Sequence, residues 1–295
     1  MPEIILYLSL GLGIGILSGF FGIGGGFILT PILLLLAFNP VIAIATSLLY
    51  TIATSLSGSF AHYRLHHIKW KPAILIGISG IIATQFAHPF VLYIERLQIE
   101  DTVVPILYIL LICYFSISLL RRQKEQILAS TIEKNTRVQV ISKTILIGFF
   151  AGFISATLGV GGGFIIVPLL ISVLSFTPKY AVGTSLFSVL LIVTAGFASY
   201  AFNTPLNYEI SGILIIGAIF GGQIGSLFTK GYSNKQIRTF LAGLYIATGI
   251  SLVLDLFKQD LVGLMTLSIY CLFLLIHFSM HSIRKRNVMK ENQTP

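Results

Sequence analysis

Nine long apolar blocks run along this chain, and most of them approach the roughly 20 residues that a helix needs to cross a bilayer. Only 10% of the 295 residues are charged, and the mean hydropathy is +0.93. Soluble domains carry about 25% charged residues, so the composition excludes a soluble globular domain and a disordered chain. Because a lone strand cannot satisfy its backbone in lipid, we predict an all-α, polytopic transmembrane helical bundle. The blocks cover residues 4–37, 40–61, 72–94, 103–120, 142–174, 179–202, 209–229, 237–255 and 261–281.

Two of these blocks, 4–37 and 142–174, are too long for one span, and a glycine cluster interrupts each of them. The clusters read GIGGGF and GVGGGF, and prolines, a Thr-Ser pair and a glutamine recur after both in register. We therefore predict an internal duplication in which each half starts with a re-entrant-type helix that is broken at its glycines. The predicted parts are a first membrane repeat (1–120), a cytoplasmic linker (121–141), a second membrane repeat (142–256), and an additional transmembrane helix with a basic cytoplasmic tail (257–295).

The basic residues indicate how the two repeats are oriented. If every block crosses once, lysine and arginine divide almost evenly between the two sides. If both broken blocks enter and leave on one side, every lysine and arginine except Arg96 and Lys258 lies on a single side. The second arrangement fits the positive-inside rule. It predicts inverted-topology repeats, an outside N-terminus and a cytoplasmic C-terminus, and it explains the net charge of +9 without a nucleic-acid partner.

The glycine clusters are the first candidates for a substrate site, because inverted repeats with broken helices are typical of secondary transporters. Glycine adopts positive φ and leaves no side chain in the way. A helix that starts directly after such a turn points free amides at it, and a helix N-terminus binds anions. Close helix packing through small residues is the alternative. The candidate residues are Gly22, Gly24, Gly25, Gly26, Phe27, Gly159, Gly161, Gly162, Gly163 and Phe164.

Polar side chains in the apolar blocks supply further candidates. Hydroxyl groups donate to an anion or bond to carbonyls of their own helix, and a glutamine amide lines a pathway or joins helices. Charged residues are missing from the centres of the blocks, so an anion would be held weakly by dipoles and hydroxyls, without a buried carboxylate as a proton relay. The candidates are Thr46, Ser47, Gln85, Thr184, Ser185 and Gln223.

The duplicated GxGGGF motif, with Pro31 or Pro168 shortly after it and a later Thr-Ser pair, resembles the sulfite exporter TauE/SafE family. The resemblance covers almost the whole chain. It implies a permease of the prokaryotic inner membrane that moves sulfite, a sulfonate or a related organosulfur anion, and it implies no cofactor. The second half carries Val167 where the first carries Thr30, so a site that uses Thr30 is asymmetric.

We therefore expect a secondary transporter that moves a small anion by alternating access. One alternative is a passive channel for small anions or neutral solutes. Another is a membrane-bound metalloenzyme on His62, His66 and His67, although iron boxes of this kind need more histidines than the six in this chain. The direction of transport and the oligomeric state stay open. Proton coupling also stays open, since sulfite itself changes protonation near neutral pH.

Overall fold

The computed structural model describes residues 2–36, 38–125, 137–201 and 208–291, and every regular element in these ranges is helical. Eight of the described helices are long and apolar enough to cross a membrane, which confirms the predicted polytopic helical bundle. Parts of the predicted linker (126–136) and tail (292–295) lie outside the described residues. The elements are α1 (Pro2–Phe21), α2 (Gly26–Leu35), α3 (Pro40–Arg64), α4 (Trp70–Arg96), α5 (Glu100–Glu125), α6 (Arg137–Leu158), α7 (Gly163–Ser172), α8 (Pro178–Ala201), α9 (Tyr208–Phe228), the 3-10 helix η1 (Thr229–Gly231), α10 (Asn234–Leu256) and α11 (Asp260–Glu291).

Both long apolar blocks are broken at their glycine clusters, as predicted. Helix α1 ends at Phe21 and α2 begins at Gly26, while α6 ends at Leu158 and α7 begins at Gly163. Helices α2 and α7 have 10 residues each. At about 1.5 Å per residue such a helix is too short to cross a bilayer, so each of them ends inside the bundle.

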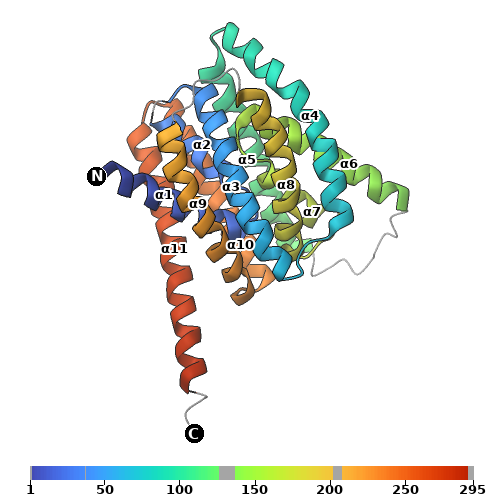
Figure 1. Ribbon diagram of the computed structural model, residues 1–295, viewed down its shortest axis with the longest axis vertical. Coiled ribbons are helices and arrows are strands. Elements are labelled where there is room, and N and C mark those ends of the chain that lie inside the picture. Colours follow the sequence, from blue (N-terminus) through green and yellow to red (C-terminus); the bar gives the residue numbers. More distant parts are fainter. Residues whose placement is uncertain (1, 37, 126–136, 202–207, 292–295) are drawn as a thin grey trace.

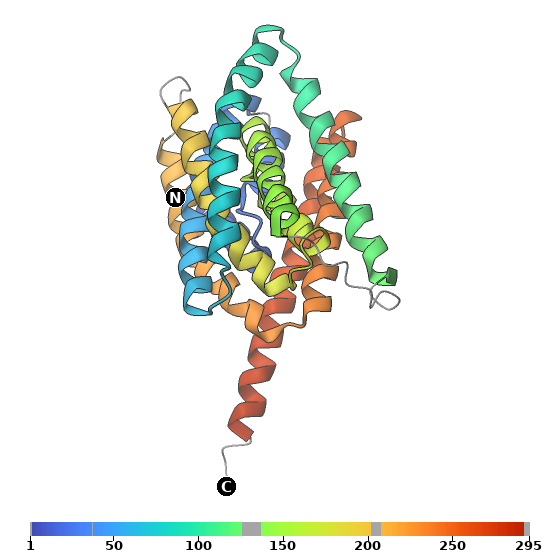
Figure 2. The same cartoon turned by 90° about the vertical axis from the view of Figure 1, so that its right-hand side faces the viewer.

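The long helices pack in pairs that correspond between the two halves of the chain. Helix α1 lies along α9 and α6 lies along α4, with α3 and α8 in contact between these pairs (Figure 1). Gly11 of α1 packs against Leu214, and its counterpart Gly148 of α6 packs against Ile76. Small residues therefore bring these backbones together. Helix α11 has no counterpart in the other half, and it extends beyond the rest of the bundle (Figure 2).

The core of the bundle lies around α2, α7 and the middle of α3 and α8. Nearly all residues of α2 and α7 are buried, and 78% of the most apolar stretch of α3 is buried as well. The two short helices are thus enclosed by the long ones. The inversion of the two halves across a membrane stays a prediction.

Candidate functional site

Two glycine loops meet in the interior of the bundle: the first glycine loop (22–26) and the second glycine loop (159–163), each counted with the first residue of the helix that follows it. All residues of both loops are buried. A Cβ atom added to Gly163 would lie 2.5 Å from the carbonyl oxygen of Gly22, and one added to Gly26 would collide with the carbonyl oxygen of Gly159. The backbones of the two loops therefore touch each other directly, through residues that the sequence marks as candidates.

The backbone of each loop uses conformations that favour glycine. Three glycines in each loop have φ between 70° and 86°, which side-chain-bearing residues adopt only with strain. Gly25 and Gly162 are the N-caps of α2 and α7 and offer no capping side chain. The first amides of a helix lack intrahelical acceptors and carry partial positive charge. Both loops thus end in helix N-termini at the centre of the protein. The positive-φ residues are Gly22, Gly24, Gly25, Gly159, Gly161 and Gly162.

The four predicted hydroxyl residues are buried, but their bonding differs between the halves. The hydroxyl of Ser185 donates to the carbonyl oxygen of Gly22 over 2.9 Å. In the other half Thr30 donates to the equivalent carbonyl, that of Gly159, over 3.2 Å. The Ser47 hydroxyl, buried as well, has no partner among the described atoms. Its hydroxyl group is therefore not used by another described group of the protein.

Thr184 and Thr46 occupy corresponding positions, one residue before these serines. The Thr184 hydroxyl accepts a hydrogen bond from the backbone amide of Lys69 over 3.1 Å. This bond ties the start of α8 to the connection between α3 and α4. Thr46 is buried in α3. The threonine of the second half therefore holds a loop in place.

Two predicted aromatic residues join the glycine loops to α5 and α10. The rings of Phe27 and Phe164 stack with centroids 5.1 Å apart. The Tyr108 hydroxyl donates to the carbonyl oxygen of Phe27 over 3.1 Å, and the Tyr245 hydroxyl donates to that of Phe164 over 2.6 Å. These matched bonds satisfy carbonyls in the first turns of α2 and α7, and the stacked rings bring the first turns of the two short helices into contact.

The two predicted glutamines do not join this group. Gln85 and Gln223 both lie on exposed faces of their helices, α4 and α9. The Gln85 amide donates to the hydroxyl of the adjacent Thr84 over 3.3 Å. Their recurrence in both halves therefore reflects a shared outer position, and the structure brings neither of them to the glycine loops.

Two threonines of α3 that the sequence analysis missed contact the loops directly. Thr51 accepts a hydrogen bond from the Gly26 amide over 2.9 Å, and Thr54 donates to the carbonyl oxygen of Gly24 over 2.9 Å. The methyl group of Thr51 also packs against Gly161 of the second loop. The available signal was the excess of hydroxyl residues between 46 and 59, which α8 does not share: Val189 stands where α3 has Thr51.

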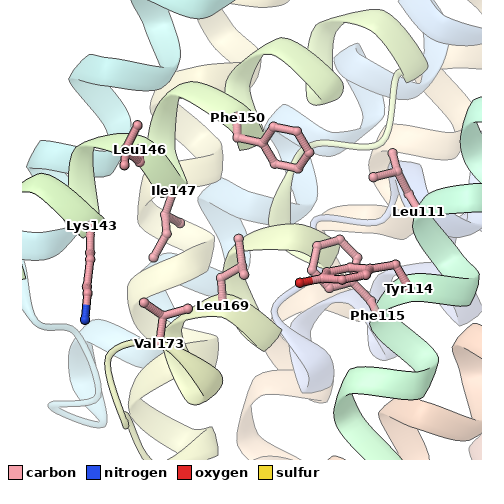
Figure 3. A pocket seen from close by; sticks show the side chains of 9 residues that line it. All are labelled: Leu111, Tyr114, Phe115, Lys143, Leu146, Ile147, Phe150, Leu169 and Val173. Atoms are coloured by element: carbon pink, nitrogen blue, oxygen red, sulfur yellow. The ribbon is translucent and has the colours of Figure 1, made fainter. Parts of the chain in front are cut away.

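An apolar cavity of about 470 Å³ lies between α5, α6 and α7, and none of its lining residues belongs to the glycine loops (Figure 3). Its lining is almost entirely hydrocarbon, with Lys143 at one edge, so it offers an anion few hydrogen-bond donors. We do not assign the substrate to it. The lining residues are Leu111, Tyr114, Phe115, Lys143, Leu146, Ile147, Phe150, Leu169 and Val173.

The histidines of the metalloenzyme alternative lie at the end of α3 and in the connection that follows it. His62 and His67 approach each other through their Nδ1 atoms, 3.3 Å apart. Burial lowers the pKa of His67, and the positive charges of Lys179 and Lys230 lower it further. Among the described residues no three histidine, cysteine or acidic side chains come close enough to hold a metal ion, so the geometry gives that alternative no support.

Comparison with known proteins places the chain among membrane transporters. The sequence model described as "Sulfite exporter TauE/SafE" matches residues 7–252. The probable membrane transporter protein YjnA of Bacillus subtilis is 29% identical over 83% of this chain and 98% of its own length. A probable membrane transporter protein of Methanocaldococcus jannaschii is 27% identical over 84% of this chain and 95% of its own. One from Haemophilus influenzae is 30% identical over 77% and 86%. No solved structure matches.

Proposed function

The chain belongs to the sulfite exporter TauE/SafE family of membrane transporters, and from that premise we propose that it is a secondary transporter for sulfite or for an organosulfur anion such as a sulfonate. It carries this anion across the cytoplasmic membrane of a prokaryote. The observation that carries the proposal is the direct contact of two buried glycine loops, each of which is followed at once by a helix N-terminus.

The chemistry of these loops suits a small anion. The amides at the starts of α2 and α7 provide partial positive charge without a fixed cation. We assign the buried hydroxyl of Ser47, which has no partner among the described atoms, as a further donor to the anion. Because no full charge neutralises the anion, binding is weak enough for release. The proposed binding residues are Gly22, Gly24, Gly25, Gly26, Phe27, Thr46, Ser47, Gly159, Gly161, Gly162, Gly163, Phe164, Thr184 and Ser185.

Alternating access is supported by the burial of the loops and by the matched contacts of the two halves. A passive channel needs a continuous open path, whereas both glycine loops are buried and the rings of Phe27 and Phe164 stack on each other in the buried core. Substrate therefore reaches the loops only after the halves move. We propose inverted halves, with the N-terminus outside and the C-terminus cytoplasmic, because that arrangement gathers the basic loops on one side.

Flux in proteoliposomes tests this proposal. The purified full chain is reconstituted, and uptake of sulfite, thiosulfate, sulfate and a small organosulfonate is followed with and without a pH gradient. We expect saturable uptake of a sulfur anion, which Gly25→Val abolishes. At Gly25 φ is +79°, and an added Cβ atom would lie 2.6 Å from the ring of Tyr50. The control is Gly196→Ala, whose added Cβ atom meets no atom closer than 3.6 Å.

Two outcomes would contradict the proposal. If folded and correctly inserted protein moves none of the four anions, its substrate is not a sulfur anion of the class that the family description names. Flux that does not saturate with concentration, and that is faster than a carrier cycle allows, would establish the passive channel instead.

A further inference from the structure

His62 occupies a position that its counterpart in the second half fills with a different chemical group. In the first half, His62 Nε2 approaches the carbonyl oxygen of Gly19 at 3.4 Å. In the second half, the Tyr200 hydroxyl donates to the carbonyl oxygen of Ala156 over 2.7 Å. Each carbonyl lies three residues before the first glycine of its loop. An imidazole exchanges a proton near neutral pH and a phenol does not, so the two ends differ in what they can bind.

The hydrogen bonds of His62 fix how many protons the histidine pair takes up. Since the Gly19 carbonyl only accepts, Nε2 of His62 carries the hydrogen and its Nδ1 is an acceptor. Nδ1 of His67, 3.3 Å away, then donates to it. One additional proton fits on Nε2 of His67 and leaves both bonds intact. A second additional proton would have to go on Nδ1 of His62, where its N–H group would face that of His67 Nδ1. The pair therefore takes up one proton.

The surroundings of the pair hold basic groups from three elements. His66 neighbours His67 in the connection between α3 and α4, Lys179 lies at the start of α8, and Lys230 lies in η1. Helices α1 and α9 contribute only uncharged groups here, the carbonyl of Gly19 and the hydroxyl of Ser226, which donates to that carbonyl over 3.2 Å. The positive charges of Lys179 and Lys230 oppose a further positive charge on the histidine pair, and an anion nearby offsets them.

The pair is connected to the first glycine loop through one turn of α1. Gly19, which accepts from His62, is followed three residues later by Gly22, whose amide donates to the carbonyl oxygen of Ser18 over 2.8 Å. The Gly22 carbonyl in turn accepts from Ser185. A change in charge at His62 and His67 therefore acts on the backbone that forms the anion site.

We propose that His62 and His67 form a proton-binding site and that transport of the anion is coupled to its protonation. This inference rests on the proposed function. Protonation adds positive charge at one end of the pathway, beside Lys179 and Lys230, and strengthens anion binding at the glycine loops. Coupling between two sites is reciprocal, so the anion in turn raises the affinity of the pair for a proton. Tyr200 gives the opposite end no such response.

The test uses an organosulfonate such as ethanesulfonate, whose charge is fixed, so that any pH dependence belongs to the protein. In proteoliposomes we expect the KM of the wild-type protein to fall at least about fivefold between pH 8 and pH 5.5, at the lower end of usual coupling. In weakly buffered detergent solution, adding ethanesulfonate drives proton uptake, read with a pH indicator. His62→Gln and His67→Gln lose both effects. If His62→Gln does not fold, because His62 is buried, His67→Gln alone tests the proposal, since His67 lies in the half-buried connection between α3 and α4.

Tyr200→Phe is the matched control, because it removes the equivalent bond to a helix carbonyl and no proton site. It keeps the pH dependence and the proton uptake of the wild-type protein. If the wild-type protein transports the anion and both histidine variants keep its pH profile, this inference is overturned and the proposed function stands. Anion binding without proton uptake has the same meaning. A wild-type protein that neither binds nor moves any of the anions overturns the proposed function, and this inference with it.

Discussion

The contact between the two glycine loops leaves no room for a single methyl group, and Gly163→Ala tests this directly. The added Cβ atom would lie 2.5 Å from the Gly22 carbonyl oxygen and 2.7 Å from the carbonyl carbon of Ile23. Ordinary contact starts at 3.4 Å, so the loops must separate by roughly 0.9 Å. Both neighbours are backbone atoms, which cannot rotate away. Overpacking of this kind costs about 1–3 kcal/mol, which lowers the population of the arrangement in which the two loops touch about 5- to 150-fold.

Two measurements test for this destabilisation. In proteoliposomes we expect the flux of Gly163→Ala to fall at least about fivefold, and in detergent we expect its thermal unfolding midpoint to fall. Gly196→Ala is the control, since its methyl group makes only ordinary contacts with Ala156 and Thr84 of the core. If Gly163→Ala matches Gly196→Ala in both flux and unfolding midpoint, the loops do not touch in the working protein.

Three further predictions concern single polar groups. Ser185→Ala leaves the buried carbonyl of Gly22 without this donor and destabilises the protein by about 1–3 kcal/mol. Ser47→Ala breaks no hydrogen bond, so it keeps the unfolding midpoint but weakens anion binding. Calorimetry measures the unfolding midpoint and the anion affinity of each variant. Tyr245→Phe likewise removes the 2.6 Å bond to a buried carbonyl and lowers the unfolding midpoint; an unchanged midpoint would contradict that bond. Lys179→Gln raises the pKa of His67 towards its ordinary value, because it removes a nearby positive charge; an NMR titration of the imidazole shows the shift or its absence.

The helices and their breaks could be predicted because both follow from local physics. Apolar runs of membrane length become helices, and consecutive glycines before Phe27 and Phe164 end one helix and allow the next to begin at a new angle. The recurrence of these clusters also predicted that the two loops have equivalent roles, and the structure brings them into contact.

The direction in which a polar side chain faces could not be predicted in the same way. In a helix that is apolar on all sides, the sequence does not distinguish an inward amide from an outward one. The sequence therefore predicts a site role for Gln85 and Gln223, whereas both side chains lie on exposed helix faces. Conversely, a comparison of the two halves could not predict Thr51, because the second half carries Val189 at the equivalent position. A group that only one half carries escapes such a comparison.

Under the proposed alternating access, the unequal hydroxyl content of α3 and α8 has a consequence for the resting state of the protein. A carrier made of two identical inverted halves would spend equal time open to each compartment, because its two open conformations would have the same energy. Here Thr51 and Thr54 bind the backbone of the first loop, while Val189 offers the second loop only hydrocarbon. This protein is therefore expected to rest with one side open in preference to the other, even when no gradient drives it.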